Sequence, residues 1–153
     1  MDKDIYYMNL ALAEARKAYK KKEVPVGCVI VYNDKVIAKS HNTRQSTKRA
    51  TNHAEMIAIN KACKKLKAWM LDDTSIYVTL EPCLMCTGAI MQSRIKNVIY
   101  AASEPKSGAL GSVVDISKVT GFNHTINVKK GVLEEEARTL IQSFFKELRS
   151  KNK

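Results

Sequence analysis

The stretch SIYVTLEPCLMC, residues 75–86, decides the fold class. Its first six residues are mostly β-branched or aromatic and predict a strand over 75–80. Pro82 follows, and a proline suits the first turn of a helix, so a helix is expected over 83–92. A strand that leads directly into a helix is the repeating step of an α/β protein.

Helical and strand patterns alternate on both sides of this stretch. A first helix is expected to run to about Lys21, with Asp2 or Asp4 as its cap. The remaining elements are expected to be a strand over 26–32, a turn at 33–34, a strand over 35–39, a loop over 40–52, a helix to about residue 66, a strand over 97–102, a loop over 103–112, a short strand and turn within 122–132, and a last helix from 134. This order predicts one α/β domain, residues 1–153, with a single sheet between helical layers.

The bulk composition is that of a globular protein of 153 residues with a 45% hydrophobic fraction. The sequence has no apolar run near the roughly 18 residues that a membrane span needs, so no membrane contact is expected. The first 22 residues lack the basic start and apolar middle of a signal peptide. A cytoplasmic protein is therefore expected.

The formal net charge of +11 is large for a small domain. It either serves solubility or indicates a polyanionic partner such as nucleic acid, because basic groups that neutralise phosphates release counterions. Four basic residues illustrate the choice, and for each of them a solvated face is the favoured interpretation: Lys48, Arg49, Lys129 and Lys130.

The four cysteines fall into two kinds. Cys28 lies in an apolar run and Cys63 in a helical stretch, so both are expected to be small buried side chains. Cys83 and Cys86 form a C-x-x-C pair at a helix start, where the positive end of the helix favours thiolates. The pair indicates either metal binding or thioredoxin-like redox chemistry.

A second helix start carries chemistry in TNHAEMIAINKA, residues 51–62. If His53 lies beside the two cysteines, three ligands converge, which is the number that a catalytic zinc site uses while leaving one position for water. His41 and His124 remain open as a fourth ligand. Glu55 is then placed to move protons between water and a leaving amine, whereas a dithiol redox site has no use for a His-x-Glu motif.

His53-Ala54-Glu55 followed by Pro82-Cys83-Leu84-Met85-Cys86 resembles the zinc-dependent nucleobase and nucleoside deaminases. The resemblance extends to the bacterial tRNA-specific adenosine deaminases over about residues 23–149. It is carried by EVPVGCVIV, HAEMIAI, YVTLEPCLMCTGAIMQSRI, KSGALGS, FNH and FFKELR. It implies a five-stranded mixed sheet between helices (a cytidine deaminase-like fold), a homodimer, and conversion of adenosine to inosine at the wobble position of a tRNA anticodon.

The resemblance also implies roles for individual residues. One zinc ion per chain would be held by His53, Cys83 and Cys86, with Glu55 as the proton shuttle. Asn42 would bind the flipped purine, and Val26 and Ala54 would line its pocket. The anticodon loop would be contacted by Glu104, Lys106, Ser107, Asn123, Phe144, Phe145 and Arg149. Both phenylalanines fall on the apolar stripe of the last helix, so at least one is expected to be mainly core.

Three residues depart from the family pattern: Glu104 replaces an aspartate, Asn52 changes the approach to His53, and Thr87 replaces an alanine. Two rival functions share the zinc ligands. One is a free-base deaminase such as guanine deaminase, against which the basic charge and the C-terminus favour RNA. The other is a non-catalytic zinc-stabilised RNA-binding module, which would have no reason to keep Glu55.

Overall fold

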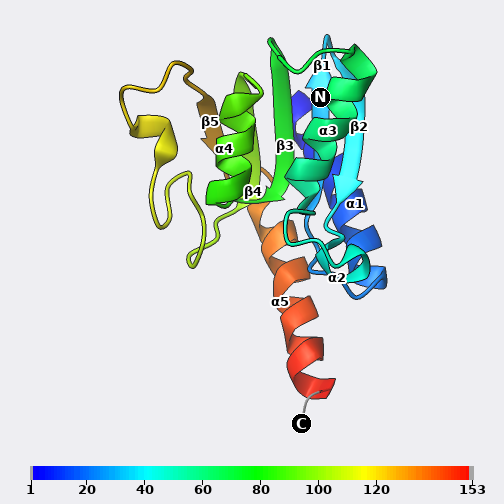
Figure 1. Ribbon diagram of the computed structural model, residues 1–153. Helices are drawn as coiled ribbons and strands as arrows, with labels where there is room; N and C mark the ends of the chain where they lie inside the picture. The colour runs from blue at the N-terminus through cyan, green and yellow to red at the C-terminus, as the bar shows by residue number, and fades with distance from the viewer. Residues whose placement is uncertain (1, 152–153) are drawn as a thin grey trace.

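The computed structural model describes residues 2–151; residues 1, 152 and 153, the ends of the expected domain, lie outside the described part. Five strands form one sheet in the order β2-β1-β3-β4-β5 (Figure 1). The strands are β1 (Gly27–Tyr32), β2 (Lys35–His41), β3 (Thr74–Leu80), β4 (Asn97–Ala102) and β5 (Asn127–Lys130). The helices are α1 (Lys3–Lys20), α2 (Arg44–Thr47), α3 (Ala54–Leu66), α4 (Leu84–Gln92), the 3-10 turn η1 (Ile116–Lys118) and α5 (Glu134–Lys151).

The sheet is mixed, as the resemblance implies. β1 pairs antiparallel with both β2 and β3, while β3, β4 and β5 are parallel. Asn33 and Asp34 form the expected hairpin turn, with left-handed φ angles of 51° and 60°. That conformation matches the twist of the two strands it joins. α4 makes the crossover from β3 to β4, so the stretch of residues 75–86 builds the centre of the fold.

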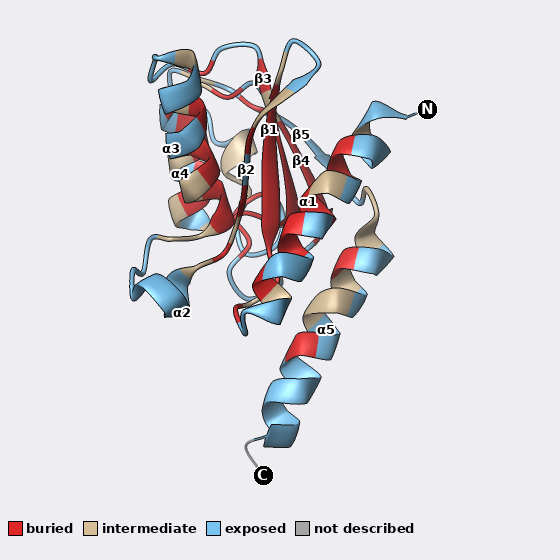
Figure 2. Cartoon of the chain, turned by 90° about the vertical axis from the view of Figure 1, so that its right-hand side faces the viewer, coloured by how far each residue is buried: buried red, intermediate tan, exposed pale blue. Residues whose placement is uncertain are grey.

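Helices cover both faces of the sheet, which confirms the three-layer α/β expectation. α3 and α4 lie on one face, and α1 and α5 lie on the other (Figure 2). Each face has its own hydrophobic core; Ile30, Val78 and Tyr100 belong to the first, and Met8 and Leu12 to the second. The C-terminal half of α5 extends beyond the sheet at the end where α3 and α4 begin (Figure 1).

α1 packs closely on β1 because Gly27 lacks a side chain. A Cβ atom at this position would lie 1.9 Å from the carbonyl oxygen of Ala11. The helix begins as expected at Asp2, whose carboxylate accepts the backbone N–H of Asp4 at 2.9 Å. Within residues 2–151, no helix is long and apolar enough to cross a membrane.

The expected loop over residues 40–52 is wrong at two places. Ser40 and His41 belong to β2, because they pair with Cys28 and Gly27 of β1. Residues 44–47 form the short helix α2, which ends at Lys48 in a left-handed conformation. Buried Glu23 holds this segment by accepting the backbone N–H groups of Gln45 at 3.0 Å and Ser46 at 2.7 Å. These long-range contacts override the loop-like local composition.

Candidate metal centre and active site

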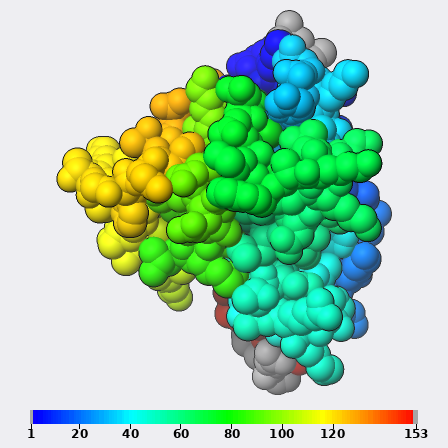
Figure 3. Space-filling view, turned by 45° about the horizontal axis from the view of Figure 1, so that its top comes forward, coloured from blue at the N-terminus to red at the C-terminus, as the bar shows by residue number. Residues whose placement is uncertain are grey.

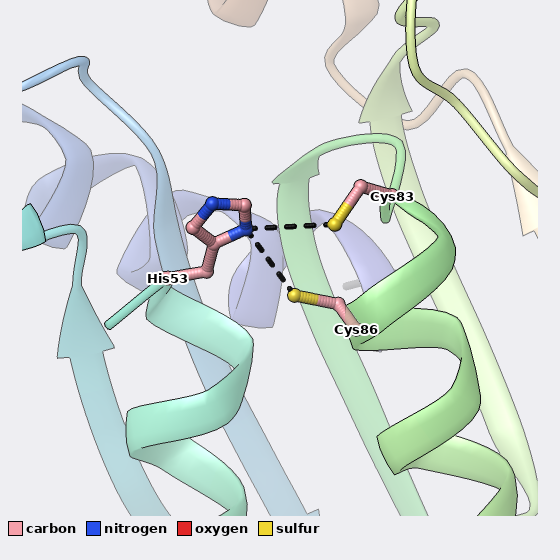
Figure 4. Close-up of side chains that lie close together, drawn as sticks. All are labelled: His53, Cys83 and Cys86. Carbon is pink, nitrogen blue, oxygen red and sulfur yellow. Dashed lines mark hydrogen bonds between the residues drawn. The ribbon is translucent and has the colours of Figure 1, made fainter. Parts of the chain in front are cut away.

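Two helix starts meet on one side of the sheet. His53 is the N-cap of α3 and Cys83 is the N-cap of α4, and both have extended rather than helical backbone. Cys86 lies one turn further along α4. Figure 4 shows the imidazole of His53 facing both sulfurs, with the same ring nitrogen directed at each. The helix N-termini direct their positive ends at this point, which favours thiolate ligands.

The three side chains lie at metal-binding distances. The Nδ1 atom of His53 is 3.6 Å from the Sγ of Cys83 and 3.4 Å from the Sγ of Cys86. A tetrahedral zinc ion bound to nitrogen and sulfur brings such atoms about 3.5 Å apart. All three ligand atoms lie within 4.8 Å of one another. The set therefore fits zinc, with one coordination position left for water.

Protons in this cluster are shared between the ligands. A hydrogen bond from Cys86 lowers the pKa of Cys83 to about 4. The same hydrogen bond, together with burial, raises the pKa of Cys86. The hydrogen bond with Cys83 raises the pKa of His53, against the opposing effect of burial. A bound cation would displace these shared protons, as metal binding to thiols and imidazoles does generally.

Glu55 is buried beside the three ligands, with 4% of its surface exposed. Burial raises the pKa of its carboxyl group, against the opposing effects of its own backbone N–H and of His53. Because His53 is an extended N-cap, the two-residue spacing does not place Glu55 on the opposite side of the helix. The acid instead lines the same hollow as His53 and Cys83.

This hollow has a volume of about 150 Å³. Seven of the residues singled out in the sequence surround it: Val26, Asn42, His53, Ala54, Glu55, Cys83 and Ser107. Four lining residues were not foreseen: Val24, Arg44, Leu80 and Glu81. Leu80 and Glu81 directly precede Pro82 in the motif. The acidic residue Glu81, next to the expected metal ligand, was the signal that could have revealed this part of the lining.

Asn42 is held rigidly in the wall of the hollow. Its Nδ2 donates to the carbonyl oxygen of Val24 at 3.3 Å, and its Oδ1 accepts the backbone N–H of Arg44 at 3.1 Å. The amide nitrogen retains one free N–H donor, and the amide oxygen retains one free acceptor position. The side chain can thus present a fixed donor and acceptor to a planar base.

The other expected contact residues lie outside the hollow. Glu104 and Lys106 belong to the same loop as Ser107, which lines the hollow, and the Glu104 carboxylate accepts the backbone N–H of Lys106 at 3.0 Å. Asn123 lines a different hollow beside α4 and accepts a hydrogen bond from Arg94. The remaining three are on α5: Phe144, Phe145 and Arg149.

The two phenylalanines differ in burial. Phe144 is 9% exposed and packs edge-on against Tyr19, with ring centroids 5.8 Å apart. Phe145 is 37% exposed and packs edge-on against Phe144. The expectation that one of them is mainly core is confirmed for Phe144.

Neither of the other histidines joins the metal cluster. The Nδ1 of His41 lies 3.1 Å from the carboxylate of Glu14, and its Nε2 lies 3.2 Å from Lys21. The Nε2 of His124 lies 2.8 Å from the carbonyl oxygen of Ile95. Among residues 2–151, the histidine and cysteine ligands that converge are His53, Cys83 and Cys86. The two alternatives for a fourth ligand therefore fall away.

The mixed sheet between helical layers, with a histidine–cysteine–cysteine cluster and a buried glutamate at two helix starts, defines a deaminase of the cytidine deaminase-like fold. Residues 1–149 match the MafB19-like deaminase family. The chain is 46% identical to the tRNA-specific adenosine deaminase of Bacillus subtilis, over the whole of this chain and 95% of the relative. It belongs to the tRNA-specific adenosine deaminase family.

Solved structures agree with this assignment. A structure from a study of A-to-I editing by tRNA:A34 deaminases superposes with a TM-score of 0.85 at 40% identity, covering 88% of this chain and 98% of the other. Guanine deaminase from Bacillus subtilis superposes with a TM-score of 0.61 at 33% identity, covering 76% and 85%. The free-base rival thus shares the fold but resembles this chain less.

Proposed function

We propose that this chain deaminates adenosine to inosine at the wobble position of a tRNA anticodon, as a single-domain cytoplasmic enzyme spanning residues 1–153. The observation that carries the proposal is the convergence of His53, Cys83 and Cys86 beside a hollow that buried Glu55 also lines. The family membership supports tRNA as the substrate, because relatives of this chain are named tRNA-specific adenosine deaminases.

The reaction replaces the C6–N bond of adenine with a C6–O bond and releases ammonia. His53, Cys83 and Cys86 would hold zinc, which lowers the pKa of water enough to provide hydroxide near neutral pH. Glu55 accepts a proton from the attacking water and delivers it to the leaving amine. Burial suits this role, since a carboxyl group with a raised pKa can both accept and return a proton.

The purine would enter the hollow between Val26, Asn42 and the backbone of Ala54. Val26 is 9% exposed and offers an apolar wall, while Asn42 offers the fixed amide described above. A base inside this hollow has been removed from the RNA stack, as enzymes that act on bases require. The anticodon loop is single-stranded, which makes that removal inexpensive.

RNA around the target base would contact surfaces outside the hollow. Ser107 lines the hollow, Glu104 and Lys106 lie in the same loop, and Asn123 lies exposed beside α4. Phe145 and Arg149 are exposed on the half of α5 that extends past the sheet, where an aromatic ring and a cation suit unstacked bases and phosphates. Phe144 contributes by fixing the orientation of Phe145.

The enzyme would act as a homodimer. Leu84, Ile116 and Phe122 line the hollow beside α4, and three more apolar residues lie in the same chain segment as Ile116 and Phe122, namely Val113, Val114 and Val119. We propose that these six residues form one apolar patch. Five of its six members are exposed large hydrophobic residues. The segment around residues 110–125 projects at the edge of the molecule in Figure 3. An exposed apolar patch of this kind marks a protein interface. Two copies of the chain related by two-fold symmetry would bury the patch of each subunit against that of the other.

The dimer is tested by sedimentation of Phe122→Glu beside wild type. The substitution should yield monomers, because a charge is placed in the centre of the patch. Trp69→Glu is the matched control, since Trp69 is 63% exposed and lies outside the patch. A dimeric Phe122→Glu protein would refute this interface.

The function is tested by incubating the purified enzyme with a tRNA that carries adenosine at the wobble position. Inosine should appear at that nucleotide and be detected by nuclease digestion and mass spectrometry. Free adenosine and free guanine serve as parallel substrates. Deamination of guanine without inosine in the tRNA would replace the proposal with the free-base rival.

A further inference from the structure

Glu81 is a buried acid with an unusual set of partners. It is 2% exposed, and its carboxylate accepts from four donors. The backbone N–H groups of Glu104, Leu110 and Ser112 donate at 3.0, 3.0 and 3.1 Å, and the hydroxyl of Ser112 donates as well. All four donors belong to the loop over residues 103–112, which carries Lys106 and Ser107.

The loop is also fixed to the two residues that follow Glu81. The backbone N–H of Ala109 donates to the carbonyl oxygen of Pro82 at 2.9 Å, and Cys83 forms an antiparallel bridge with Gly108. Gly108 is needed here, because a Cβ atom would lie 2.3 Å from the carboxylate of Glu81. The loop is therefore wrapped around the carboxylate that lies two residues before a metal ligand.

We infer that Glu81 is a positioning residue, which holds the loop over residues 103–112 in the conformation that receives the nucleotides next to the target adenosine. This inference rests on the proposed function. Glu81 is one of the residues that line the hollow, but it acts through Lys106 and Ser107. It thereby ties this loop to the segment that carries Cys83.

The chemistry requires a carboxylate at this position. Two oxygens that each accept two hydrogen bonds match four donors, whereas an amide presents N–H groups to half of them. Glu81→Gln preserves the size of the side chain but leaves donors facing donors. The loop should then lose its fixed position, and a displacement of about 1 Å can cost up to about 10²-fold in rate.

The test is a double-mutant cycle with an anticodon stem-loop that contains the wobble adenosine. Four proteins are compared for zinc content, kcat and KM: wild type, Glu81→Gln, the loop variant Lys106→Ala/Ser107→Ala, and their combination. Glu81→Gln should keep its zinc and raise KM more than it lowers kcat. The combination should be no worse than the more impaired parent, because both changes remove the same contacts.

Glu23→Gln is the matched control. Glu23 is 1% exposed and also holds backbone N–H groups, but those of the α2 segment. When Glu23→Gln is combined with the loop variant, the two fold-increases in KM should multiply, because the two changes act independently. If the KM effects of Glu81→Gln and the loop variant also multiply, or if Glu81→Gln leaves KM unchanged, Glu81 has only a structural role and the inference is overturned.

Two further measurements keep the inference testable. If Glu81→Gln fails to fold, Ser112→Ala removes one of the four donors and should raise KM less strongly. Its KM effect should again not multiply with that of the loop variant. If the two effects do multiply, the inference is overturned. Amide hydrogen exchange at Glu104 and Leu110 should accelerate in either variant. A wild type that makes no inosine would refute the proposed function, and unchanged exchange at those amides would refute the role of Glu81.

Discussion

The candidate metal centre and the surfaces proposed to face RNA are built in opposite ways. The centre gathers His53, Glu55, Cys83 and Cys86 from two helix starts, and Glu55 and Cys86 are buried there. All of them except Cys86 line one hollow. The residues proposed to face RNA lie on three separate parts of the chain, the loop over 103–112, the segment near Asn123 and the end of α5. Apart from Glu104 and Phe144, they are exposed.

This difference follows from what each region does. Bond making needs a few groups held within fractions of an ångström, so one lost group removes the reaction. RNA binding adds many screened contacts to phosphates and bases, so one lost group weakens the sum. Substitutions in the two regions should therefore differ in size and in what they change.

The largest effect is expected from Cys83→Ala. Loss of one of three protein ligands should remove zinc, abolish inosine formation and lower thermal stability, because metal binding contributes to folding. Elemental analysis and thermal unfolding measure this. Cys63→Ala is the control, since Cys63 lies on α3 outside the cluster and should keep both zinc and activity. Retained zinc in Cys83→Ala would disprove the ligand assignment.

Glu55→Gln should separate chemistry from metal binding. The variant keeps the side-chain size but cannot move protons, so deamination should fall roughly 10²–10⁴-fold, the contribution of general acid–base catalysis. Zinc content and affinity for the stem-loop should match wild type. Loss of zinc would make Glu55 a ligand, and full activity would assign the proton transfer to another group.

Arg149→Ala should act in the opposite manner. Removal of one phosphate contact should weaken stem-loop binding and reduce the slope of log affinity against log salt by about 1. Zinc content should not change. Arg138→Ala is the matched control on the same helix, because its guanidinium is paired with Glu134 at 3.1 Å and with Glu135. Equal salt slopes for both variants would remove Arg149 from the RNA surface.

The smallest effect is expected from Thr87→Val, a change beside the metal ligands. Among the described residues that are not exposed, the Thr87 hydroxyl is the buried side-chain oxygen without a hydrogen-bond partner. Its replacement by a methyl group of similar size should stabilise the fold by about 1 kcal/mol. Thermal unfolding should shift upward by roughly 2–4 °C, with zinc content unchanged. A lower midpoint would show that the hydroxyl is satisfied, for example by water.

The amino-acid sequence alone determined the order of the five strands and of the long helices, and it identified the three candidate metal ligands. Strand 75–80, the helix after Pro82 and the Asn33-Asp34 turn depend on local propensity, and all three form as expected. The C-x-x-C pair is also a local feature, because spacing along one helix start fixes both sulfurs. The tRNA-specific deaminase family was recognisable from the same motifs.

Tertiary structure decided what depends on partners far along the chain. His53 and Cys83 are 30 residues apart, and they meet because α3 and α4 cover the same face of the sheet. His41 forms the end of β2 because Gly27 of β1 pairs with it. Its Nδ1 then lies 3.1 Å from the carboxylate of Glu14. Glu23 and Glu81 appear in the sequence as ordinary acids. Their roles exist only because loops 22 to 31 residues away bring backbone N–H groups to buried carboxylates that would otherwise be unpaired.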